Sequence, residues 1–332
     1  MELQLNGKIL IITNRSDYTA DVVIKRLRER NVAFVRFNTE DYPLRTKASV
    51  RVQEGKDKVT LKCEKWELDD NGVASVWYRR PALPNLESAN LDPKDKEFAA
   101  RESVEFMQTL WRLLARHFWI TQPDVLRRVE TKALQLKGAA EVGFETPDTL
   151  FSNDIEDIKS FYRLHKCKVV VKPISHGGYG DSDEMAIFTN ELGNGFDESQ
   201  FDSSQSSPFI IQERVEKRLD VRLTAFGGCC FAHSISPRVA GSYAMDWRKS
   251  RPEDLRYSII ETPRKIAEAV ALFMDRFQMS FGAFDFACRN DGTWVFLEAN
   301  PNGQWAWLEL ATGAPMSDAL INLLVSRGNG SL

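Results

Sequence analysis

Apolar residues near the N-terminus alternate between two spacings, which predicts strands and helices in turn. Residues 7–14, GKILIITN, form the unbroken apolar run that is typical of a buried parallel strand. Residues 18–31 carry apolar side chains at helical spacing, and residues 32–38, VAFVRFN, predict another strand. This order predicts a βαβ unit and therefore an α/β fold.

Further strands and one long helix complete a first domain. The helix is predicted over 92–118, with Asp92 as its N-cap and Pro93 at its first helical position. Three short strands are predicted before it, at residues 48–53, 58–64 and 73–81. We therefore expect an α/β domain at residues 1–120.

The next segment, residues 121–210, is predicted to be a second domain. It opens with a helix and continues through a Gly/Pro turn to the strand KVVVKP at 168–173. Its polar tract at 190–208 is rich in Gly, Ser, Asn and Asp, which predicts a surface loop or hairpin tip.

Residues 211–332 are predicted to form the third domain, with a mixed sheet. A hairpin is expected over 220–236 around Gly-Gly, followed by a polar loop at 235–260. A helix then follows with Thr262 as N-cap and Pro263 in its first turn, and an apolar helix ends the chain.

Composition narrows the class of protein. A net charge of −3 over 332 residues provides no basic field for nucleic acid or a membrane surface. The sequence has no run of about 18 apolar residues and no signal-peptide pattern. Its five cysteines lack CxxC spacing, which argues against a zinc site or a disulfide framework. We therefore expect a cytoplasmic protein without nucleic-acid or membrane partners.

Two aromatic-rich runs near the C-terminus predict a β-hairpin. Residues 281–288, FGAFDFAC, and 293–299, TWVFLEA, are typical strands, and Asp291-Gly292 between them is a strong turn signal. If these two residues are the loop, counting back along both arms fixes which residues pair across the strands.

This register places three oxygen-bearing side chains together. Asp285 lies opposite Glu298, and Asn300 shares their face because it follows Glu298 by two positions. Carboxylates that are so close repel each other unless a cation lies between them, and oxygen donors suit Mg²⁺. A solvated sheet face, or a carboxylate with a raised pKa, remains the alternative.

Two cations in apolar strands suggest a phosphate site. Lys172 ends the run VVVK and precedes the Gly-rich turn ISHGGYGD at 174–181, whose backbone amides could approach phosphate oxygens. Arg222 stands likewise in a predicted strand, where it pairs with His233 across the hairpin. Mg²⁺ held by carboxylates commonly binds phosphate oxygens, so the predicted metal site and the predicted phosphate site are compatible.

Taken in order, these motifs resemble those of the ATP-grasp ligases over about residues 121–325. The matching elements are Lys132 in a helix, Lys172 before the Gly-rich loop, the hinge IIQERVE, the Asp-x-Arg strand with Asp220 and Arg222, and the metal set Asp285, Glu298 and Asn300. EANPNGQWAWLE, VWYRRP and AMDWR resemble motifs of one branch, the graspetide synthetases. This resemblance implies an ATP-grasp fold behind an N-terminal pre-ATP-grasp domain.

The resemblance also implies an activity. Members of this branch use ATP and Mg²⁺ to activate Asp or Glu side chains of a ribosomal precursor peptide as acyl phosphates. Ser or Thr hydroxyls, or Lys amines, then close ω-ester or ω-amide rings, while a leader segment docks on the enzyme. We also expect a homodimer.

The resemblance assigns roles to the individual residues. The nucleotide would be bound by Lys132 and Lys172 at the phosphates, the loop Ser175, His176, Gly177 and Gly178, the hinge residues Gln212, Glu213 and Val215 at adenine, and Asp220 at the ribose. Arg222 would meet the transferred phosphoryl group. We further expect Arg238, Asp246 and Arg248 to hold the acidic core peptide, because they lie in a polar, cation-bearing loop just after the Arg222 hairpin.

Two other functions remain open. One is a carboxylate–amine ligase that acts on a free amino acid or short peptide, since the same nucleotide residues would serve it. The other is a non-catalytic nucleotide-binding protein, against which the full set of metal ligands, lysines and Arg222 argues.

Overall fold

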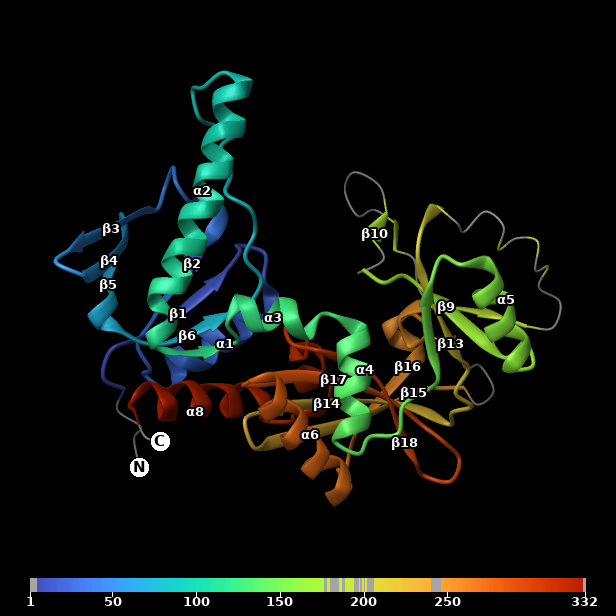
Figure 1. Ribbon diagram of the computed structural model, residues 1–332. Coiled ribbons are helices and arrows are strands. Elements are labelled where there is room, and N and C mark those ends of the chain that lie inside the picture. The colour runs from blue at the N-terminus through green and yellow to red at the C-terminus, as the bar shows by residue number, and fades with distance from the viewer. Residues whose placement is uncertain are drawn as a thin grey trace.

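The computed structural model describes most of the chain (Figure 1). The described residues are 5–175, 178–179, 185–186, 189–193, Asp197, Ser199, Phe201, 206–239 and 246–330. Single turns of 3-10 helix lie at Thr39–Asp41 (η1), Asp70–Gly72 (η2), Leu114–Arg116 (η3), Trp247–Lys249 (η5) and Pro252–Asp254 (η6).

A four-stranded parallel sheet forms the N-terminal part, as the βαβ pattern predicts. Its strands are Lys8–Thr13 (β1), Phe34–Asn38 (β2), Val73–Tyr78 (β6) and Phe118–Ile120 (β7), in the order β2-β1-β6-β7. Along β1, Ile9 and Ile11 pack with helix α1 (Tyr18–Glu29), whereas Leu10 and Ile12 pack with helix α2 (Pro93–Leu113). The predicted N-cap of α2 is confirmed, because Asp92 accepts hydrogen bonds from the first-turn amides.

An antiparallel ribbon extends the core beneath α2. It consists of Lys47–Gln53 (β3), Lys56–Cys63 (β4) and Trp66–Asp69 (β5). Val59, Leu61 and Leu68 are buried against the α2 side of the parallel sheet. The sequence analysis did not predict β5, which has only four residues.

The central part is a four-stranded antiparallel sheet. Its strands are Thr149–Ser152 (β8), Val169–Lys172 (β9), Asn190–Leu192 (β12) and Phe209–Glu213 (β13), in the order β12-β9-β13-β8. Helix α5 (Ile155–Leu164) packs on it, and α3 (Pro123–Val129) and α4 (Lys132–Glu141) precede it. Gly178–Tyr179 (β10) and Met185–Ala186 (β11) form a separate short ladder.

The third sheet has five antiparallel strands. They are Leu219–Phe226 (β14), Cys229–Pro237 (β15), Leu255–Ile260 (β16), Phe281–Cys288 (β17) and Trp294–Asn300 (β18), in the order β16-β15-β14-β17-β18. The parallel component predicted for this sheet is limited to an isolated bridge between Glu145 and Val295. Helix α6 (Arg264–Phe277) covers one face, where Phe273 packs against Phe284 and Phe296.

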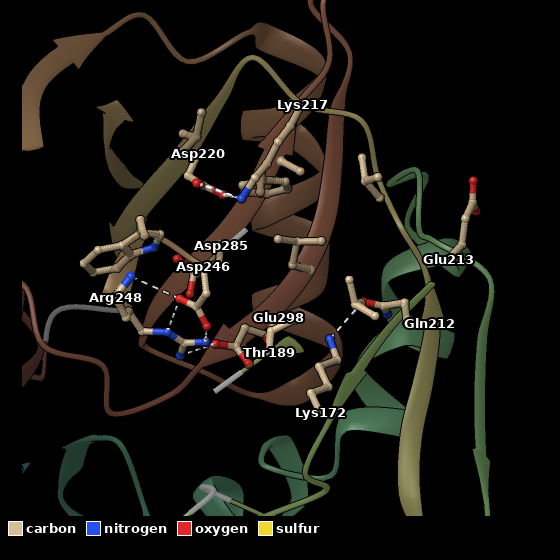
Figure 2. A pocket seen from close by; sticks show the side chains of 17 residues that line it. Lys172, Thr189, Gln212, Glu213, Lys217, Asp220, Asp246, Arg248, Asp285 and Glu298 are labelled. Atoms are coloured by element: carbon tan, nitrogen blue, oxygen red, sulfur yellow. Dashed lines mark hydrogen bonds and ion pairs between the residues drawn. The ribbon is translucent and has the colours of Figure 1, made fainter. Parts of the chain in front are cut away.

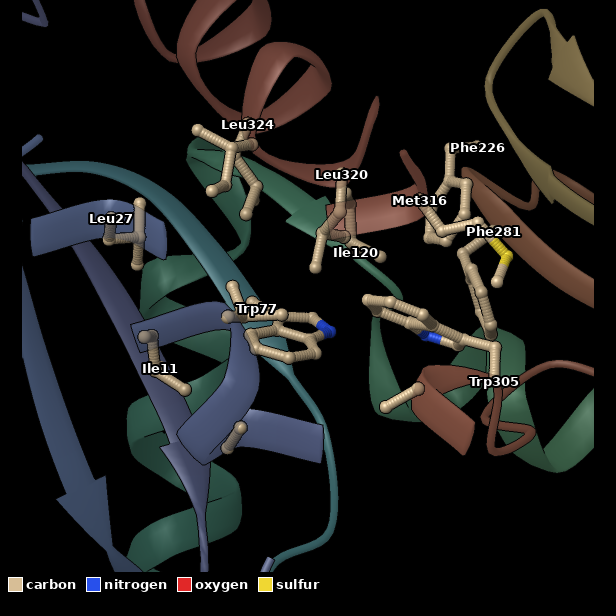
Figure 3. Packing of buried hydrophobic residues seen from close by; sticks show 14 of the residues in the cluster. Ile11, Leu27, Trp77, Ile120, Phe226, Phe281, Trp305, Met316, Leu320 and Leu324 are labelled. Carbon is tan, nitrogen blue, oxygen red and sulfur yellow. The ribbon is translucent and has the colours of Figure 1, made fainter. Parts of the chain in front are cut away.

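The C-terminal helices return to the N-terminal sheet (Figure 3). Trp305 precedes α7 (Ala306–Thr312), and α8 (Met316–Gly328) lies beneath the parallel sheet in Figure 1. Trp77 of β6 and Trp305 belong to one core cluster that also holds Leu320 of α8. The N-terminal and C-terminal parts therefore share a continuous hydrophobic core.

Three local predictions need correction. Helix α6 begins one residue later than predicted: Pro263 is its N-cap, and the Thr262 side chain does not cap it. The tract 190–208 begins as the edge strand β12, because Asn190 to Leu192 pair with β9. The predicted polar loop at 235–260 contains β16, an edge strand that pairs only with β15 in the sheet order.

The three-domain division stays a proposal, with one adjustment. The boundaries at 120, 210 and 332 match the three sheets except that residue 210 falls within β13, which pairs with β8 and β9. We therefore propose moving that boundary to follow Glu213. Across the described ranges, every helix is too short or too polar to traverse a lipid bilayer.

Candidate functional site

A cleft lies between the central sheet and the C-terminal sheet (Figure 2). Strands β9 and β13 supply one wall, and β14, β17 and β18 supply the other. The cleft encloses about 730 Å³, counting space open to solvent, which is enough for a nucleotide-sized ligand. A second cleft of about 1120 Å³ adjoins it and shares Lys172, Thr189, Arg248 and Glu298.

The predicted pairing of Asp285 with Glu298 across β17 and β18 is confirmed. The turn differs from the prediction, however. Cys288 pairs with Trp294, and the amide of Arg289 donates to the carbonyl of Thr293, so three residues rather than two form the loop. Gly292 adopts φ +89°, which suits a three-residue hairpin loop.

A register shift restores the predicted pairing. Between Asp285 and Phe286 the ladder slips by one residue, so that Leu297 of β18 is left over as a bulge. The longer loop and the bulge therefore compensate each other. Asp285 and Glu298 face each other because both irregularities occur.

Arg222, Asp285 and Glu298 form a row across three neighbouring strands, β14, β17 and β18. Arg222 Nε and Nη2 donate to the two Asp285 carboxylate oxygens at 2.6 and 3.0 Å. Burial raises the pKa of Asp285 to about 6, with Arg222 acting against the rise and Glu298 adding to it. The predicted pairing of Arg222 with His233 is also confirmed.

Cations surround Glu298. Burial disfavours its charge, but Arg248, Lys172 and Lys132 hold the pKa of Glu298 below its ordinary value. Arg248 Nη1 lies 3.7 Å from Glu298 Oε1, and Arg248 also donates to both Asp246 oxygens at 2.8 Å. Glu298 thus stays ionised at neutral pH in the middle of a positive cluster (Figure 2).

The donor set fits a hard divalent cation. Two facing carboxylates on adjacent strands suit Mg²⁺, and the raised pKa of Asp285 reflects a buried carboxylate that positive charge would stabilise. Asn300 lines the second cleft together with Glu298. Within the described ranges, no three His, Cys, Asp or Glu side chains gather as a metal site. The predicted set has only two carboxylates, and its third donor, Asn300, is an amide. The set Asp285, Glu298 and Asn300 therefore stays a prediction.

Lys172 ends β9 at the junction of both clefts. Burial lowers the pKa of its ammonium to about 8, and the neighbouring cations Lys132 and Arg248 add to the effect although Glu298 opposes it. Its Nζ donates to Gln212 Oε1 at 2.9 Å, and the Gln212 amide donates to Thr149 Oγ1 at 2.7 Å. The lysine is therefore half-buried and held in place from the neighbouring strand.

Lys132 occupies the first position of α4 and lines the second cleft. Its Nζ donates to the carbonyl oxygens of Pro173 and Ser175 at 2.9 and 3.1 Å. The lysine therefore holds the start of the Gly-rich loop. His176 and Gly177 lie outside the described residues, and Gly178 belongs to β10.

The predicted adenine and ribose residues line the first cleft, including Glu213 and Val215 of the hinge. The side chain of Gln212 is engaged by Lys172 and Thr149, which leaves the hinge backbone as the better candidate for adenine contacts. Asp220 is bound by Lys217 Nζ at 2.7 and 2.8 Å. Lys217 was missed by the sequence analysis because a lysine beside a hinge is ordinarily solvated.

The predicted substrate residues are separated. Asp246 is the N-cap of η5, Arg248 lies within it, and both line the first cleft. Arg238 follows β15, its Nε donates to the carbonyl of Leu255 at 3.0 Å, and it is not among the described residues lining either cleft. Trp247, to which the sequence analysis assigned no role, places its ring 5.8 Å from the Arg222 guanidinium.

Gln135 was also missed by the sequence analysis. This buried residue of α4 donates to the carbonyls of Val129 and Ala299 at 2.6 and 2.8 Å, and accepts from the Ala299 amide at 2.8 Å. Ala299 stands between Glu298 and Asn300 on the outer edge of β18. A polar residue three positions after Lys132, on the same helix face, is the only signal in the sequence.

Comparison with known proteins agrees with this architecture. Residues 8–127 match the family model described as the MvdD pre-ATP grasp domain. No match was found among curated proteins.

Solved structures are similar over the full length of the chain. A Chryseobacterium gregarium RiPP-associated ATP-grasp ligase, in complex with ADP and a leader and core peptide, is 27% identical with a TM-score of 0.88, covering 98% of this chain and 99% of that one. The macrocyclase MdnC from Microcystis aeruginosa MRC, bound with the precursor peptide MdnA, is 28% identical with a TM-score of 0.82, covering 96% and 99%. PsnB, another ATP-grasp ligase, is 19% identical with a TM-score of 0.74, covers 96% and 99%, and supports the fold alone.

The predicted family is therefore confirmed by the fold and by these comparisons. The cleft between two antiparallel sheets, the N-terminal domain match and the full-length similarities agree with one another. Together they show an ATP-grasp fold with a pre-ATP-grasp domain at the N-terminus, in a chain that is similar over its full length to RiPP-associated ATP-grasp ligases, as the predicted resemblance to graspetide synthetases implies.

Proposed function

We propose that this protein is an ATP-dependent macrocyclase that closes ω-ester or ω-amide rings in a ribosomally made precursor peptide. The observation that carries this proposal is the convergence of Lys132, Lys172, Arg222 and Arg248 around Asp285 and Glu298. Four cations about two half-buried carboxylates suit a site that neutralises phosphate charge. The relatives solved with leader and core peptides support a peptide substrate.

Asp285, Glu298 and Asn300 would hold Mg²⁺, and the hinge at Glu213 and Val215 would contact adenine. When bound, ATP supplies the γ-phosphoryl group and Mg²⁺ neutralises part of the phosphate charge. Asp220, with Lys217 at its side, is the candidate for the ribose hydroxyls.

The peptide chemistry has two steps. First, a side-chain carboxylate oxygen of the core peptide bonds to phosphorus while the bond to ADP breaks, which gives an acyl phosphate. Second, a Ser or Thr oxygen, or a Lys nitrogen, attacks the carbonyl carbon, loses its proton, and inorganic phosphate leaves. Each ring thus removes the elements of one water from the peptide.

The cationic side chains of the protein divide this work. Lys132 and Lys172 would hold the α- and β-phosphates, and Lys132 also anchors the loop that begins at Ser175. Arg222 would meet the transferred phosphoryl group and then the oxyanion of the second step. Arg248, between Asp246 and Glu298, would bind the acidic side chain of the core peptide.

Arg238 is kept only as a contact to more distant parts of the peptide, because its guanidinium is engaged outside both clefts. We further propose a homodimer, which light scattering would test. The five free cysteines support a cytoplasmic location, where thiols stay reduced.

The test uses purified protein, ATP, Mg²⁺ and the short peptide encoded beside its gene, if that peptide has a leader and a core with Thr or Ser and Asp or Glu. Mass spectrometry should show ATP-dependent loss of one water per ring, and fragmentation should map the linked residues. If the peptide stays intact while free amino acids are joined to amines, the protein is a small-molecule ligase. If ADP is never released, a non-catalytic protein is indicated.

A further inference from the structure

Arg79 is a buried arginine at the end of β6, in the VWYRRP motif, for which the proposed chemistry provides no role. Arg79 is 1% exposed. It stands two positions after Trp77, which belongs with Trp305 to the core shared by the N-terminal and C-terminal parts (Figure 3). Among the described residues, it lines neither cleft of the proposed site.

The Arg79 guanidinium reaches across to the turn that follows β18. Its Nη1 donates to the backbone oxygen of Asn302 at 2.6 Å and to the Asn302 side-chain oxygen at 2.9 Å. The Asn302 side-chain amide in return donates to the backbone carbonyl of Arg79. Each residue therefore binds the other through side chain and backbone, across 223 positions of sequence.

Asn302 in turn orients the predicted metal donor Asn300. The amide of Asn302 donates to Asn300 Oδ1 at 2.9 Å, and the amide of Gly303 donates to the Asn300 carbonyl at 3.3 Å. The turn is closely packed, since a Cβ on Gly303 would come within 2.6 Å of the Ala283 side chain on β17. A displacement of Asn302 would therefore be passed on to Asn300.

The other side of Arg79 is fixed within the N-terminal domain. Its Nε lies 3.7 Å from Asp17 Oδ2, and its Nη2 donates to Thr19 Oγ1 at 3.4 Å. Asp17 is itself the N-cap of α1 and accepts from Thr13 Oγ1 at 2.7 Å. The Arg79 guanidinium thus links the N-terminus of α1 to Asn302, in the turn that follows Asn300.

We propose that Arg79 is a positioning residue through which the pre-ATP-grasp domain sets the geometry of the metal site. This inference rests on the proposed function only in that Asn300 is taken as a Mg²⁺ ligand. A partner that orients a metal ligand commonly changes metal affinity about 10- to 100-fold when it is removed. The N-terminal domain would accordingly be needed for Mg²⁺ binding as well as for packing.

The test measures ADP binding by calorimetry over a range of Mg²⁺ concentrations, without any peptide. In Asn302→Ala and Arg79→Lys, we expect a rise of about tenfold in the Mg²⁺ concentration that gives half of the maximal increase in ADP affinity. The ADP affinity measured without Mg²⁺ should not change. Arg79→Lys keeps a positive charge near Asp17 but cannot supply the same fork to Asn302.

Two controls separate positioning from general destabilisation. Arg80→Ala changes the exposed neighbour in the same motif, and Arg116→Met removes an arginine of the same domain that pairs with Asp57 and Asp70. Both should keep the wild-type Mg²⁺ dependence, even if Arg116→Met unfolds at lower urea.

The inference is overturned if Asn302→Ala and Arg79→Lys retain the wild-type Mg²⁺ dependence, or if Arg116→Met shifts it equally. Failure of the proposed function would look different. A wild-type protein that never modifies a peptide could still show these Mg²⁺ shifts with ADP.

Discussion

Replacing Lys172 with Met should make the protein more stable while abolishing tight nucleotide binding. Burial lowers the pKa of this lysine from 10.5 to about 8, so keeping it charged at pH 7 costs folding free energy. At about 1.4 kcal/mol per pKa unit, the cost is roughly 3 kcal/mol. Partial solvent exposure reduces this figure, and the bond to Gln212 is worth about 1 kcal/mol. We therefore expect Lys172→Met to gain about 1–2 kcal/mol at pH 7.

The pH dependence has a definite sign. Between about pH 8 and pH 10.5 the unfolded chain binds more protons at Lys172 than the folded protein does, so wild-type stability rises with pH relative to the variant. The cost of the charged lysine is complete below about pH 8 and disappears as the pH approaches 10.5. The stability advantage of Lys172→Met should accordingly shrink between pH 7 and pH 9.5.

Urea unfolding of both proteins at several pH values measures this difference, and calorimetry with Mg²⁺ and ADP measures binding. Lys168→Met is the matched control, because that lysine precedes the same strand and is exposed. It should change neither quantity appreciably. The reasoning fails if Lys172→Met is less stable than wild type at pH 7, or if its advantage does not vary with pH.

Other substitutions probe separate parts of the site. Arg248→Ala should slow ring closure about a hundredfold while ADP affinity stays near wild type, as peptide turnover and calorimetry would show; lost ADP affinity would assign Arg248 to the nucleotide instead. Gln135→Leu should cost about 2–4 kcal/mol in urea unfolding, because it leaves buried backbone groups of Ala299 unpaired. The same variant should need more Mg²⁺ for ADP binding, and an unchanged requirement would limit Gln135 to a structural role. Deleting Leu297 should remove the bulge and keep Asp285 opposite Glu298, because Glu298 would then follow Phe296 directly, so a deletion variant that needs much more Mg²⁺ for ADP binding would contradict that register.

The hairpin of β17 and β18 shows how far local pattern could predict the site. Aromatic strands around Asp-Gly were enough to place Asp285 against Glu298. The assumed two-residue loop was nevertheless wrong, and the prediction held because the bulge at Leu297 shifts the register by one residue. A bulge depends on packing around the strand, which the alternation of apolar residues does not reveal.

Residues that act over long separations could not be found in this way. Gln135 binds Ala299 across 164 positions, and Arg79 binds Asn302 across 223. Both are polar side chains in segments whose patterns predict a helix and a strand, and their partners are largely backbone groups that carry no residue-specific signal. Lys172 and Arg222 were found because each is a cation in an apolar strand, whereas Lys132 was found because its place along the chain resembles a family pattern.

The short edge strands were missed for a related reason. Strands β12 and β16 have polar or exposed side chains, so hydropathy favours loops there. Their strand structure comes from pairing with β9 and β15, which is a tertiary effect.

Oxygen-isotope transfer tests the central claim most directly, because an acyl phosphate moves an oxygen atom from peptide to phosphate. A precursor whose core Asp and Glu side chains carry oxygen-18 would be incubated with the protein, ATP and Mg²⁺, and the released phosphate analysed by mass spectrometry. The account predicts one labelled oxygen in phosphate for each ring closed. Rings that form while the phosphate stays unlabelled would contradict it.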